Sequence, residues 1–481
     1  MHICIVGAGA AGWIACNFLK NKDFIKKITV VGSSKLPSIG VGESTTVQMS
    51  NFVSELIRAG DFSLEDFLIG TNAAIKYGVL YKNWSEKDFL HYFKSTAEFS
   101  KEKTEEKMIF YGRMLANKPE SVHIHEIMGS EIFECAKNNN LALDQNFYGM
   151  SYHFDANKFI EFMSNLSKKN KKVSFIDDKV IGGQKPNDSI FFIDTEKNGR
   201  IHADFYIFAT GDYTINEEFL GIKYKSYSDI LLTNKAIAYP LPYKNKKEEM
   251  HPYTVAKTMK YGWRWITPTW ERIGTGYVFS DHYISVDKAV DEFRKDIGDN
   301  KIEPFVVDFS PKKNTQEIHE NWCTIGMASG FLEPLDAPGL DLVLRSLSCE
   351  ISEYLNYMRF YCPPNENKQN NIEKERLNLS LLQKYDFWAT FILSQYKTSS
   401  RLDTEFWKDH KNIKWNFYDN IMQNIDNELS MELMMLHQTM AGKDIKWKTR
   451  ISYKPYKTIS TNFDTINHYE YLKRIREKHE H

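Results

Sequence analysis

The amino-acid sequence predicts an α/β fold with a mainly helical C-terminal region, and three observations support that prediction. A short apolar strand at residues 2–6 runs directly into a glycine-rich turn. From about Gly339 onward, apolar residues recur at helical spacing. Between these regions, apolar runs with the length and composition of strands recur at 28–31, 172–176, 189–194, 205–209 and 272–280.

Length and charge exclude several classes of protein. The 481 residues are 42% apolar and 26% charged, which is enough apolar material for a large buried core. With 62 basic and 63 acidic residues the net charge is −1, so no nucleic-acid partner is expected. No run of about 18 apolar residues occurs, so no membrane partner is expected either.

The cysteines are too few and too scattered for a disulfide framework. They stand at positions 4, 16, 135, 323, 349 and 362. None of them forms a CxxC pair of the kind that holds zinc, so no metal is expected. Free thiols fit a reducing compartment, and the expected location is the cytoplasm.

The N-terminal segment has the pattern of a dinucleotide-binding βαβ unit. The first strand is followed by a predicted helix over 12–21 and a second strand at 28–31. A GxGxxG motif joins strand to helix: its first glycine permits a tight turn, its second admits a pyrophosphate, and its third lets helix and strand pack closely. The helix N-terminus then attracts the anion. The expected contacts are Gly7, Gly9, Ala10, Ala11 and Gly12, with a plain glycine turn as the alternative.

Two further segments favour FAD over NAD as the dinucleotide. The run FYIFATGD at 205–212 is a strand that returns to the nucleotide in the manner of flavoproteins. The run SIGVGESTT at 38–46 offers the cofactor small residues and hydroxyl groups. Its expected contacts are Gly40, Val41, Gly42, Glu43 and Ser44.

One part of the dinucleotide pattern is missing. An acidic residue normally grips the ribose after the second strand, but this sequence has Gly32 there. The hydroxyl of Ser33 is expected to substitute for it.

The polar stretch CPPNENKQNN at 362–371 is the best candidate for a linker. It separates a predicted FAD-binding body at 1–361, which includes the substrate-site insertions, from a helical and aromatic cap at 372–481. The cap ends in a charged tail, YLKRIREKHEH.

Eight short segments stand in a distinctive order along the chain. They are GAGAAGW (7–13), IGVGEST (39–45), AAIKYGVLYKNW (73–84), FLHYF (89–93), YHFDANKF (152–159), GWRWITP (262–268), WERIGTGYVFS (270–280) and IGMASGFLEPLDAPGL (325–340). In that order and spacing, from residue 1 to about residue 410, the chain resembles the flavin-dependent halogenases of the tryptophan-halogenase type. The Lys- and Asn-rich composition and the divergent last segment point towards the phage-encoded members of that family. The resemblance implies a Rossmann-like FAD box of the flavin-monooxygenase (GR2) type.

The resemblance also implies a reaction. In this family, FADH2 from a separate flavin reductase reacts with oxygen to give a C4a-hydroperoxide, which halide attacks. The resulting hypohalous acid passes to a lysine beside the substrate, and Lys76 falls on that lysine. An amine can hold hypohalous acid, or form a haloamine, in a dry pocket. A surface lysine is the alternative, although the apolar neighbours in AIKYGVL (74–80) argue against it.

The family's second catalytic residue is an acid, and Asp336 in EPLDAPG (333–339) occupies its position. A carboxylate there can favour the charged form of the lysine and accept the proton that the ring releases. Aspartate is one methylene shorter than the family's glutamate, and capping of the helix near Gly339 is an alternative role.

The same segment binds halide in the family, through two backbone N–H groups that align with Pro338 and Gly339. Proline has no N–H, so one donor to the anion is lost. Chloride has the largest desolvation cost, and we therefore expect bromide or iodide to be used better than chloride.

Further positions carry over from the resemblance. Trp263 and Trp265 are expected to keep organic substrate away from the flavin, with two core tryptophans as the alternative. Gly326 and Leu335 are expected to contact the flavin.

Two rings match the family's substrate clamp. His91 and Phe93 are expected to stack on the aromatic substrate, and a structural histidine is the alternative for His91. The tryptophan that completes the clamp is not assigned among Trp388, Trp407, Trp415 and Trp447.

The expected function is therefore FADH2- and oxygen-dependent halogenation of an electron-rich aromatic ring of the indole or phenol type. The expected partners are a separate flavin reductase and a small aromatic substrate, and a homo-oligomer is compatible with the sequence. Residues that bind the amino-acid end of free tryptophan do not align, so free tryptophan and a wider substrate range both stay open. Two other functions stay open as well: an aromatic hydroxylase, and a non-catalytic flavin-binding descendant suggested by the departures at Gly32, Asp336 and Pro338.

Overall fold

The computed structural model describes residues 1–33, 43–85, 88–92, 136, 138–142, 150–212, 214–361, 367–416 and 465–480. The chain divides into two compact units, each assembled from three separate stretches. The first unit comprises Met1–Thr71, Phe154–Leu231 and Phe309–Ala389, and the second comprises Asn72–His153, Leu232–Asp308 and Thr390–His481. These units are defined by contacts within the chain. The division into a body at 1–361 and a cap at 372–481 stays a prediction.

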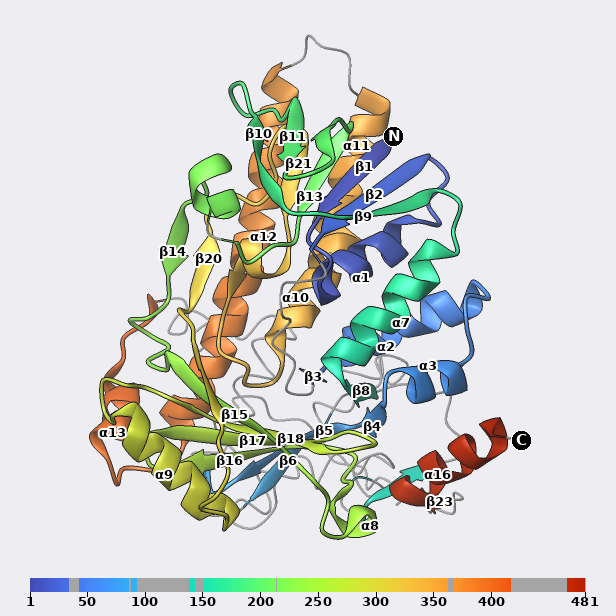
Figure 1. The fold of residues 1–481 in the computed structure, drawn as a ribbon. Coiled ribbons are helices and arrows are strands. Elements are labelled where there is room, and N and C mark those ends of the chain that lie inside the picture. Colours follow the sequence, from blue (N-terminus) through green and yellow to red (C-terminus); the bar gives the residue numbers. More distant parts are fainter. Residues whose placement is uncertain are drawn as a thin grey trace, which may run out of the picture. The chain divides into compact units, whose positions relative to one another are not determined.

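A five-stranded parallel sheet forms the centre of the first unit, in the order β21–β13–β1–β2–β9. Strand β1 (His2–Val6) pairs in parallel with both β2 (Lys27–Gly32) and β13 (Phe205–Phe208). Crossovers between parallel strands require helices, and α1 (Ala10–Leu19) and α7 (Ala156–Lys168) pack against the sheet and against each other (Figure 1). The predicted βαβ opening and α/β class are confirmed.

The apolar runs of the sequence explain this sheet. All four residues of β13 are buried, as a strand covered on both faces requires. The remaining elements of this unit are β3 (Glu43–Ser44), α2 (Val47–Arg58), α3 (Leu64–Gly70), β9 (Val173–Asp177), β10 (Val180–Gln184), β11 (Phe192–Thr195), β12 (Gly199–Ile201), η2 (Thr214–Phe219), β14 (Tyr224–Ser226), β20 (Lys312–Asn314), β21 (Trp322–Thr324), η3 (Gly326–Ala328), β22 (Gly330–Phe331), α10 (Pro338–Ser346), η4 (Leu347–Ile351), α11 (Ser352–Tyr361) and most of α12 (Asn367–Thr398). The part of α12 from Thr390 on belongs to the second unit.

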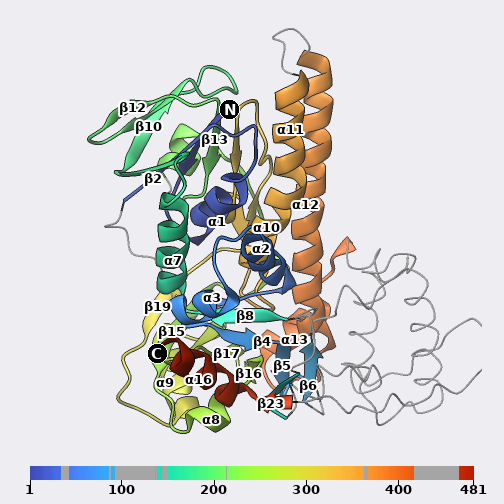
Figure 2. The ribbon, with the colours of Figure 1, turned by 90° about the vertical axis from the view of Figure 1, so that its right-hand side faces the viewer.

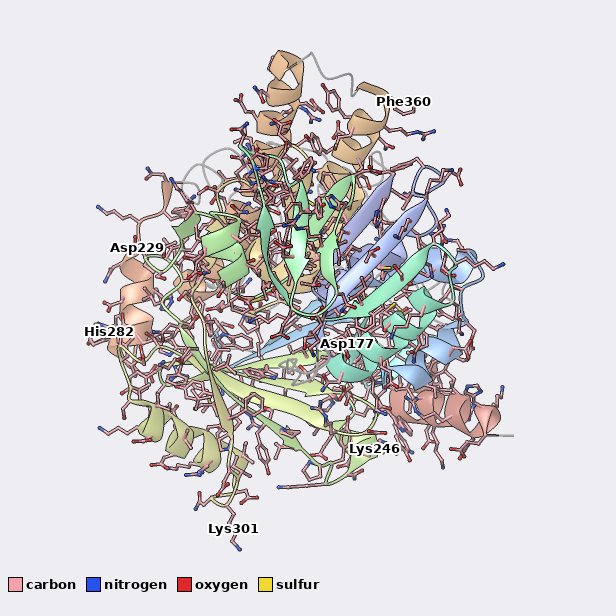
Figure 3. All side chains as sticks on the ribbon, turned by 45° about the horizontal axis from the view of Figure 1, so that its top comes forward. Asp177, Asp229, Lys246, His282, Lys301 and Phe360 are labelled. Atoms are coloured by element: carbon pink, nitrogen blue, oxygen red, sulfur yellow. The ribbon has the colours of Figure 1, made fainter. Side chains whose placement is uncertain are left out.

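The predicted helical region begins at Pro338, one residue before the expected position. Helices α11 and α12 run side by side (Figure 2), and Arg376 of α12 bridges Glu353 of α11 at 2.6 Å. Phe360, near the end of α11, is 67% exposed (Figure 3).

The predicted linker at 362–371 is wrong in its second half, because α12 begins at Asn367. From residue 367 the sequence is rich in Lys, Gln, Glu and Arg, which are good helix formers. The polarity of the first of these residues suggested a linker instead of a helix.

A seven-stranded sheet forms the centre of the second unit, in the order β19–β15–β18–β17–β16–β5–β6. Its pairings are antiparallel except for the parallel pair β16–β5. The elements of this unit are β4 (Ala74–Lys76), β5 (Gly78–Lys82), β6 (Phe89–Tyr92), β7 (Asn140–Ala142), β8 (Ser151–Phe154), β15 (Lys235–Leu241), α8 (Lys246–Glu249), β16 (Thr254–Met259), β17 (Gly262–Pro268), β18 (Ile273–Phe279), α9 (Val286–Ile297), β19 (Phe305–Asp308), α13 (Glu405–Asn412), β23 (Thr465–Asn467) and α16 (His468–His479).

The charged tail of the sequence is ordered as helix α16. It follows strand β23, which pairs with β7 so that Ile466 lies opposite Leu141. Its buried residues are His468, Leu472 and Ile475, which recur at helical spacing beneath a charged surface. Within the described ranges, no helix is long and apolar enough to cross a membrane.

Candidate active site

The turn between β1 and α1 accepts glycine alone at two positions. Gly7 has a φ of +118°, and a Cβ there would lie 2.6 Å from the carbonyl oxygen of Ala209. A Cβ on Gly12 would lie 1.9 Å from the carbonyl oxygen of Gly7. The N–H of Gly7 donates to the carbonyl of Val31 at 2.8 Å. The turn therefore packs tightly against the ends of β2 and β13, as a dinucleotide turn requires.

The remaining glycine of the motif faces open space. Gly9 is the N-cap of α1, and a Cβ built on it would meet no atom within 4 Å. No acidic side chain stands in the first turn of α1, which begins with Ala10 and Ala11. The first N–H groups of a helix lack intrahelical acceptors and attract anions. A crowded turn beside an open helix start fits the phosphates of a dinucleotide.

The missing acidic residue has a steric explanation. A Cβ on Gly32 would lie 2.5 Å from the Cβ of Ala8 and 2.7 Å from its backbone nitrogen. The end of β2 thus lies directly on the glycine turn, and no side chain fits at position 32. Ser33, the predicted substitute, follows directly and is half-buried.

Gly326 lies against the same turn. Its φ is +59°, and a Cβ there would lie 2.9 Å from the Cβ of Ala11. The N–H of Ile325 donates to the carbonyl of Phe208 at 2.8 Å, which fixes the segment to the end of β13. Leu335, also predicted to contact the flavin, is fully buried in the same unit. The structure therefore gathers Gly7, Ala11 and Gly326 at one place.

The EPLDAPG segment has an unusual backbone. Asp336 and Ala337 have φ values of +60° and +62°, a left-handed conformation that costs roughly 1–2 kcal/mol for each non-glycine residue. Ala337 is the N-cap of α10, and Pro338 is its first helical residue. Gly339 therefore supplies the first N–H of this helix. The alternative role of Asp336 as the N-cap of this helix is wrong, because Ala337 occupies that position. Asp336 as a whole residue is 8% exposed.

A buried carboxylate that the sequence did not reveal lies one turn further along. Asp341 of α10 accepts hydrogen bonds from Thr46 Oγ1 at 2.5 Å, Arg345 Nε at 2.6 Å and Trp388 Nε1 at 3.1 Å. Thr46 stands two residues after the predicted flavin contact Ser44 and is the N-cap residue of α2. Asp341 thus joins the starts of α2 and α10 to α12.

Lys76 is completely buried in the second unit. It ends strand β4, which pairs with β8 so that Lys76 lies opposite Ser151 and Ala74 lies opposite His153. Ser151 and His153 are also fully buried. The alternative of a surface lysine is therefore wrong.

Both residues that flank Lys76 are held through their backbone. The N–H of Tyr77 donates to the carbonyl of Pro252 at 2.7 Å. The N–H of Ile75 donates to Nε2 of His468 at 3.0 Å, and Nδ1 of His468 meets the carbonyl of Met250 at 3.1 Å. Burial lowers the pKa of His468 to about 3, so its ring is neutral at neutral pH.

His153 is the second buried histidine near Lys76. Its Nε2 lies 2.8 Å from Oγ1 of Thr254, and its Nδ1 has no hydrogen-bond partner among the described residues. Burial lowers its pKa well below the ordinary value, and the charge of Lys76 and the proximity of His468 add to that shift. The lysine thus has a neutral imidazole in its electrostatic surroundings.

Trp263 and Trp265 lie on one face of β17, with ring centroids 6.4 Å apart and planes inclined at 60°. They are 2% and 9% exposed. Trp265 lies opposite Gly276 of β18, where a Cβ would come within 2.0 Å of the indole. The GTG pattern in β18 thus makes room for the second tryptophan.

The predicted substrate clamp is only partly described. His91 stands on β6 opposite Val79, and its ring lies 5.7 Å from that of Phe391. Phe93 lies outside the described residues, as do Gly40, Val41 and Gly42.

The candidate tryptophans of the cap are also only partly among the described residues. Trp407 is fully buried and donates from Nε1 to the carbonyl of Met259 at 3.0 Å. Trp415 donates to Oγ1 of Thr390 at 2.8 Å, whereas Trp447 lies outside the described ranges.

The family comparison agrees with this geometry. The protein-family model for tryptophan halogenases matches residues 2–442 of this chain.

The chain belongs to the tryptophan halogenase family.

It is thus a flavin-dependent halogenase, an oxidoreductase, and the predicted family and enzyme class are confirmed. The chain is 26% identical to the tryptophan 6-halogenase of Streptomyces toxytricini, over 85% of this chain and 80% of that protein. It is 25% identical to the tryptophan 7-halogenase of Lentzea aerocolonigenes, over 88% of this chain and 81% of that protein.

Solved structures confirm the halogenase fold. The apo structure of VirX1 has a TM-score of 0.75 and 26% identity, and covers 91% of this chain and 84% of its own. The tryptophan halogenase of Shewanella frigidimarina has a TM-score of 0.81 and 21% identity, and covers 100% and 93%.

Within the halogenase, sequence motifs identified the glycine turn, Lys76 and the EPLDAPG segment but missed three polar residues beside them. His153 lies within the YHFDANKF segment, whose role the sequence did not indicate. Asp341 and His468 belong to no motif. Among the described residues, no group of three or more His, Cys, Asp or Glu side chains is placed to hold a metal.

Proposed function

We propose that this chain halogenates an electron-rich aromatic ring of the indole or phenol type, with FADH2, oxygen and halide as co-substrates. The observation that carries the proposal is the complete burial of Lys76, an amine, in a strand beside neutral His153. Burying a lysine costs free energy, and buried titratable groups are concentrated at functional sites. The relatives named above act on tryptophan, which makes tryptophan the first substrate to test.

The glycine turn of the first unit fits FAD. Its open Gly9 and the uncapped start of α1 would hold the pyrophosphate, Ser33 would hold the ribose, and Gly326, which lies against the same turn, would also contact the cofactor. FADH2 would supply two of the four electrons that reduce oxygen, and the halide would supply the other two as it is oxidised to hypohalous acid. The sequence offers one nucleotide fingerprint, so a separate reductase would provide the reduced flavin.

In this proposal Lys76 receives hypohalous acid and presents its halogen to the ring. The buried setting excludes bulk water, which would otherwise compete for the electrophile. Asp336 would take the proton that the ring releases. Trp263 and Trp265 would keep the organic substrate from the flavin, and His91 with Phe93 would stack on it.

The halide would bind at the start of α10. Pro338 is the first helical residue and has no N–H, so Gly339 supplies the first backbone donor. A site with fewer donors compensates desolvation least for the small chloride ion. Bromide or iodide is therefore the better substrate in this proposal.

One experiment separates this function from its alternatives. Purified protein is supplied with a flavin reductase, FAD, NADH, oxygen and equal concentrations of chloride, bromide and iodide, together with tryptophan and a panel of indoles and phenols. Mass spectrometry then looks for halogen isotope patterns. Halogenated product that depends on Lys76 supports the proposal.

Hydroxylated product without halide, unaffected by Lys76→Ala, would show a hydroxylase instead. FAD binding without any product would show a non-catalytic descendant. A reaction without the protein, to which hypohalous acid is added, measures the background halogenation.

A further inference from the structure

The strand that carries Lys76 is held along two edges. On one edge β4 pairs with β8, where Lys76 lies opposite Ser151. On the other edge the N–H groups of the residues that flank the lysine point away from β8. Pro252 accepts from Tyr77 at 2.7 Å, and His468 accepts from Ile75 at 3.0 Å.

His468 reaches this place from the far end of the sequence. It begins α16, directly after β23, and its own N–H donates to the carbonyl of Asn139 at 2.9 Å. Figures 1 and 2 show α16 and β23 beside α8. The family match ends at residue 442, so His468 lies outside the part of the chain that identifies the family, whereas its partners lie within it.

The hydrogen bonds of His468 define its tautomer. Nε2 faces an N–H and must accept, so the proton sits on Nδ1, which donates to the carbonyl of Met250 at 3.1 Å. Burial lowers the pKa of this imidazole to about 3, which keeps the accepting nitrogen unprotonated. A protonated ring would direct Nε2–H at the N–H of Ile75 and break the contact. The side chain is thus a neutral bridge with one donor and one acceptor.

We propose that His468 is a positioning residue for Lys76: its imidazole holds the free edge of β4 so that the amine keeps one location beside the aromatic ring. This inference rests on the proposed role of Lys76. In the halogenation step, the halogen of HOX bonds to a ring carbon and the O–X bond breaks. The displaced ring proton passes to Asp336 and from there to the hydroxide, which leaves as water. A lysine that moves delivers HOX poorly, and HOX escapes into the solvent.

The test compares His468→Ala with His468→Gln, because glutamine keeps one donor and one acceptor on a side chain of similar length. The matched control is Glu470→Gln, at a position on the same helix as His468. It removes the salt bridge of 3.0 Å between Glu470 and Lys247 of α8 without changing a contact of β4. Thermal melting and FAD titration establish that each variant is folded. The assays then measure kcat and KM for the aromatic substrate, and the HOX caught by a diketone halogen trap.

In His468→Ala we expect kcat to fall about tenfold or more while KM changes less than about twofold, since misplacement affects the reacting geometry rather than binding. The fraction of HOX that reaches the trap should rise. His468→Gln should recover most of kcat, and Glu470→Gln should resemble the wild type in both readouts.

The inference is overturned if folded His468→Ala keeps the wild-type kcat and trap fraction, or if Glu470→Gln loses as much as His468→Ala. If His468→Ala does not fold, His468→Gln and His468→Asn are compared instead. Asparagine is too short to reach both the N–H of Ile75 and the carbonyl of Met250, so we expect it to be less active than glutamine. Equal activity of the two variants would contradict the inference. Lys76→Ala separates the two proposals. If it halogenates normally, the role of Lys76 itself is wrong; if it is inactive while His468→Ala is normal, only the present inference fails.

Discussion

The indole of Trp265 occupies the space into which a side chain at Gly276 would project. The two residues lie opposite each other in β17 and β18, and Cη2 of the ring would be 2.0 Å from a Cβ on the glycine. The glycine and the tryptophan are therefore one packing unit, and neither can change alone without cost.

Gly276→Ala should lower the free energy of unfolding by about 1–3 kcal/mol through overpacking. Trp265→Ala should cost about 3–5 kcal/mol because it leaves a cavity. Urea unfolding of both single variants and the double variant checks this. We expect the double variant to lose less than the sum; a strictly additive result would contradict the packing unit. The carbonyl oxygen of Ile237, 2.1 Å from the same Cβ position, limits the recovery.

The two glycines of the nucleotide turn should respond differently to alanine. Gly12→Ala places a Cβ 1.9 Å from the Gly7 carbonyl and should lower both stability and FAD binding. Gly9→Ala meets no protein atom within 4 Å, and its φ of −82° suits alanine. It should melt like the wild type but bind FAD roughly tenfold more weakly, because the methyl group stands where the pyrophosphate approaches. Fluorescence titration measures the affinity for FAD, and melting of the FAD-free protein measures its stability. If Gly9→Ala bound FAD with wild-type affinity, the cofactor would not bind at this turn.

Pro338→Ser should shift the halide preference towards chloride. The substitution restores an N–H at the first position of α10, beside that of Gly339, and so adds a donor for the anion. Competition at equal chloride and bromide concentrations, with products counted by mass spectrometry, gives the ratio directly. An unchanged ratio would show that this N–H does not contact the halide.

The buried histidines should make the protein sensitive to mild acid. Burial lowers the pKa of His410 and His468 from 6.5 to about 3, so the unfolded chain takes up protons below about pH 6.5 that the folded chain does not. The free energy of unfolding should therefore fall as the pH decreases through this window, by up to about 1.4 kcal/mol per pH unit for each residue. Urea unfolding at about pH 7 and pH 5.5 measures the slope.

His410→Gln should reduce the pH dependence of the free energy of unfolding by the contribution of one histidine, up to about 1.4 kcal/mol per pH unit. His282→Gln, at an exposed position (Figure 3), is the matched control and should leave the slope unchanged. Equal slopes in the His410 variant and the wild type would mean that His410 is not held neutral.

Local patterns in the sequence were sufficient for much of the fold and for part of the site. The glycine turn was predictable because Gly7 and Gly12 are required by the local backbone geometry, while Gly9 leaves the start of α1 open. Lys76 was singled out by the family resemblance, and its burial was predictable from its apolar neighbours. His468 and Asp341 were not, because their partners Ile75 and Thr46 lie hundreds of residues away and a single sequence does not record such pairs.

One error came from composition. The stretch at 367–371 is polar and was interpreted as a linker, although it lies within α12. The absence of an acid at position 32 has a cause that the sequence does not show: Ala8 of the glycine turn occupies the space where a Cβ on Gly32 would stand. The role of Ser33 as its substitute stays a prediction.

The interleaving of the two units has a consequence for how the protein is made and engineered. Each unit needs three stretches of chain, so the first is incomplete until residue 389 emerges from the ribosome, and the second is incomplete until the stretch that begins at Thr390 has followed. Ile75, in the strand of Lys76, is synthesised 393 residues before its acceptor His468. Exchanging substrate preference with a relative therefore cannot be done by joining two halves at one crossover point; it requires grafting several separate stretches together.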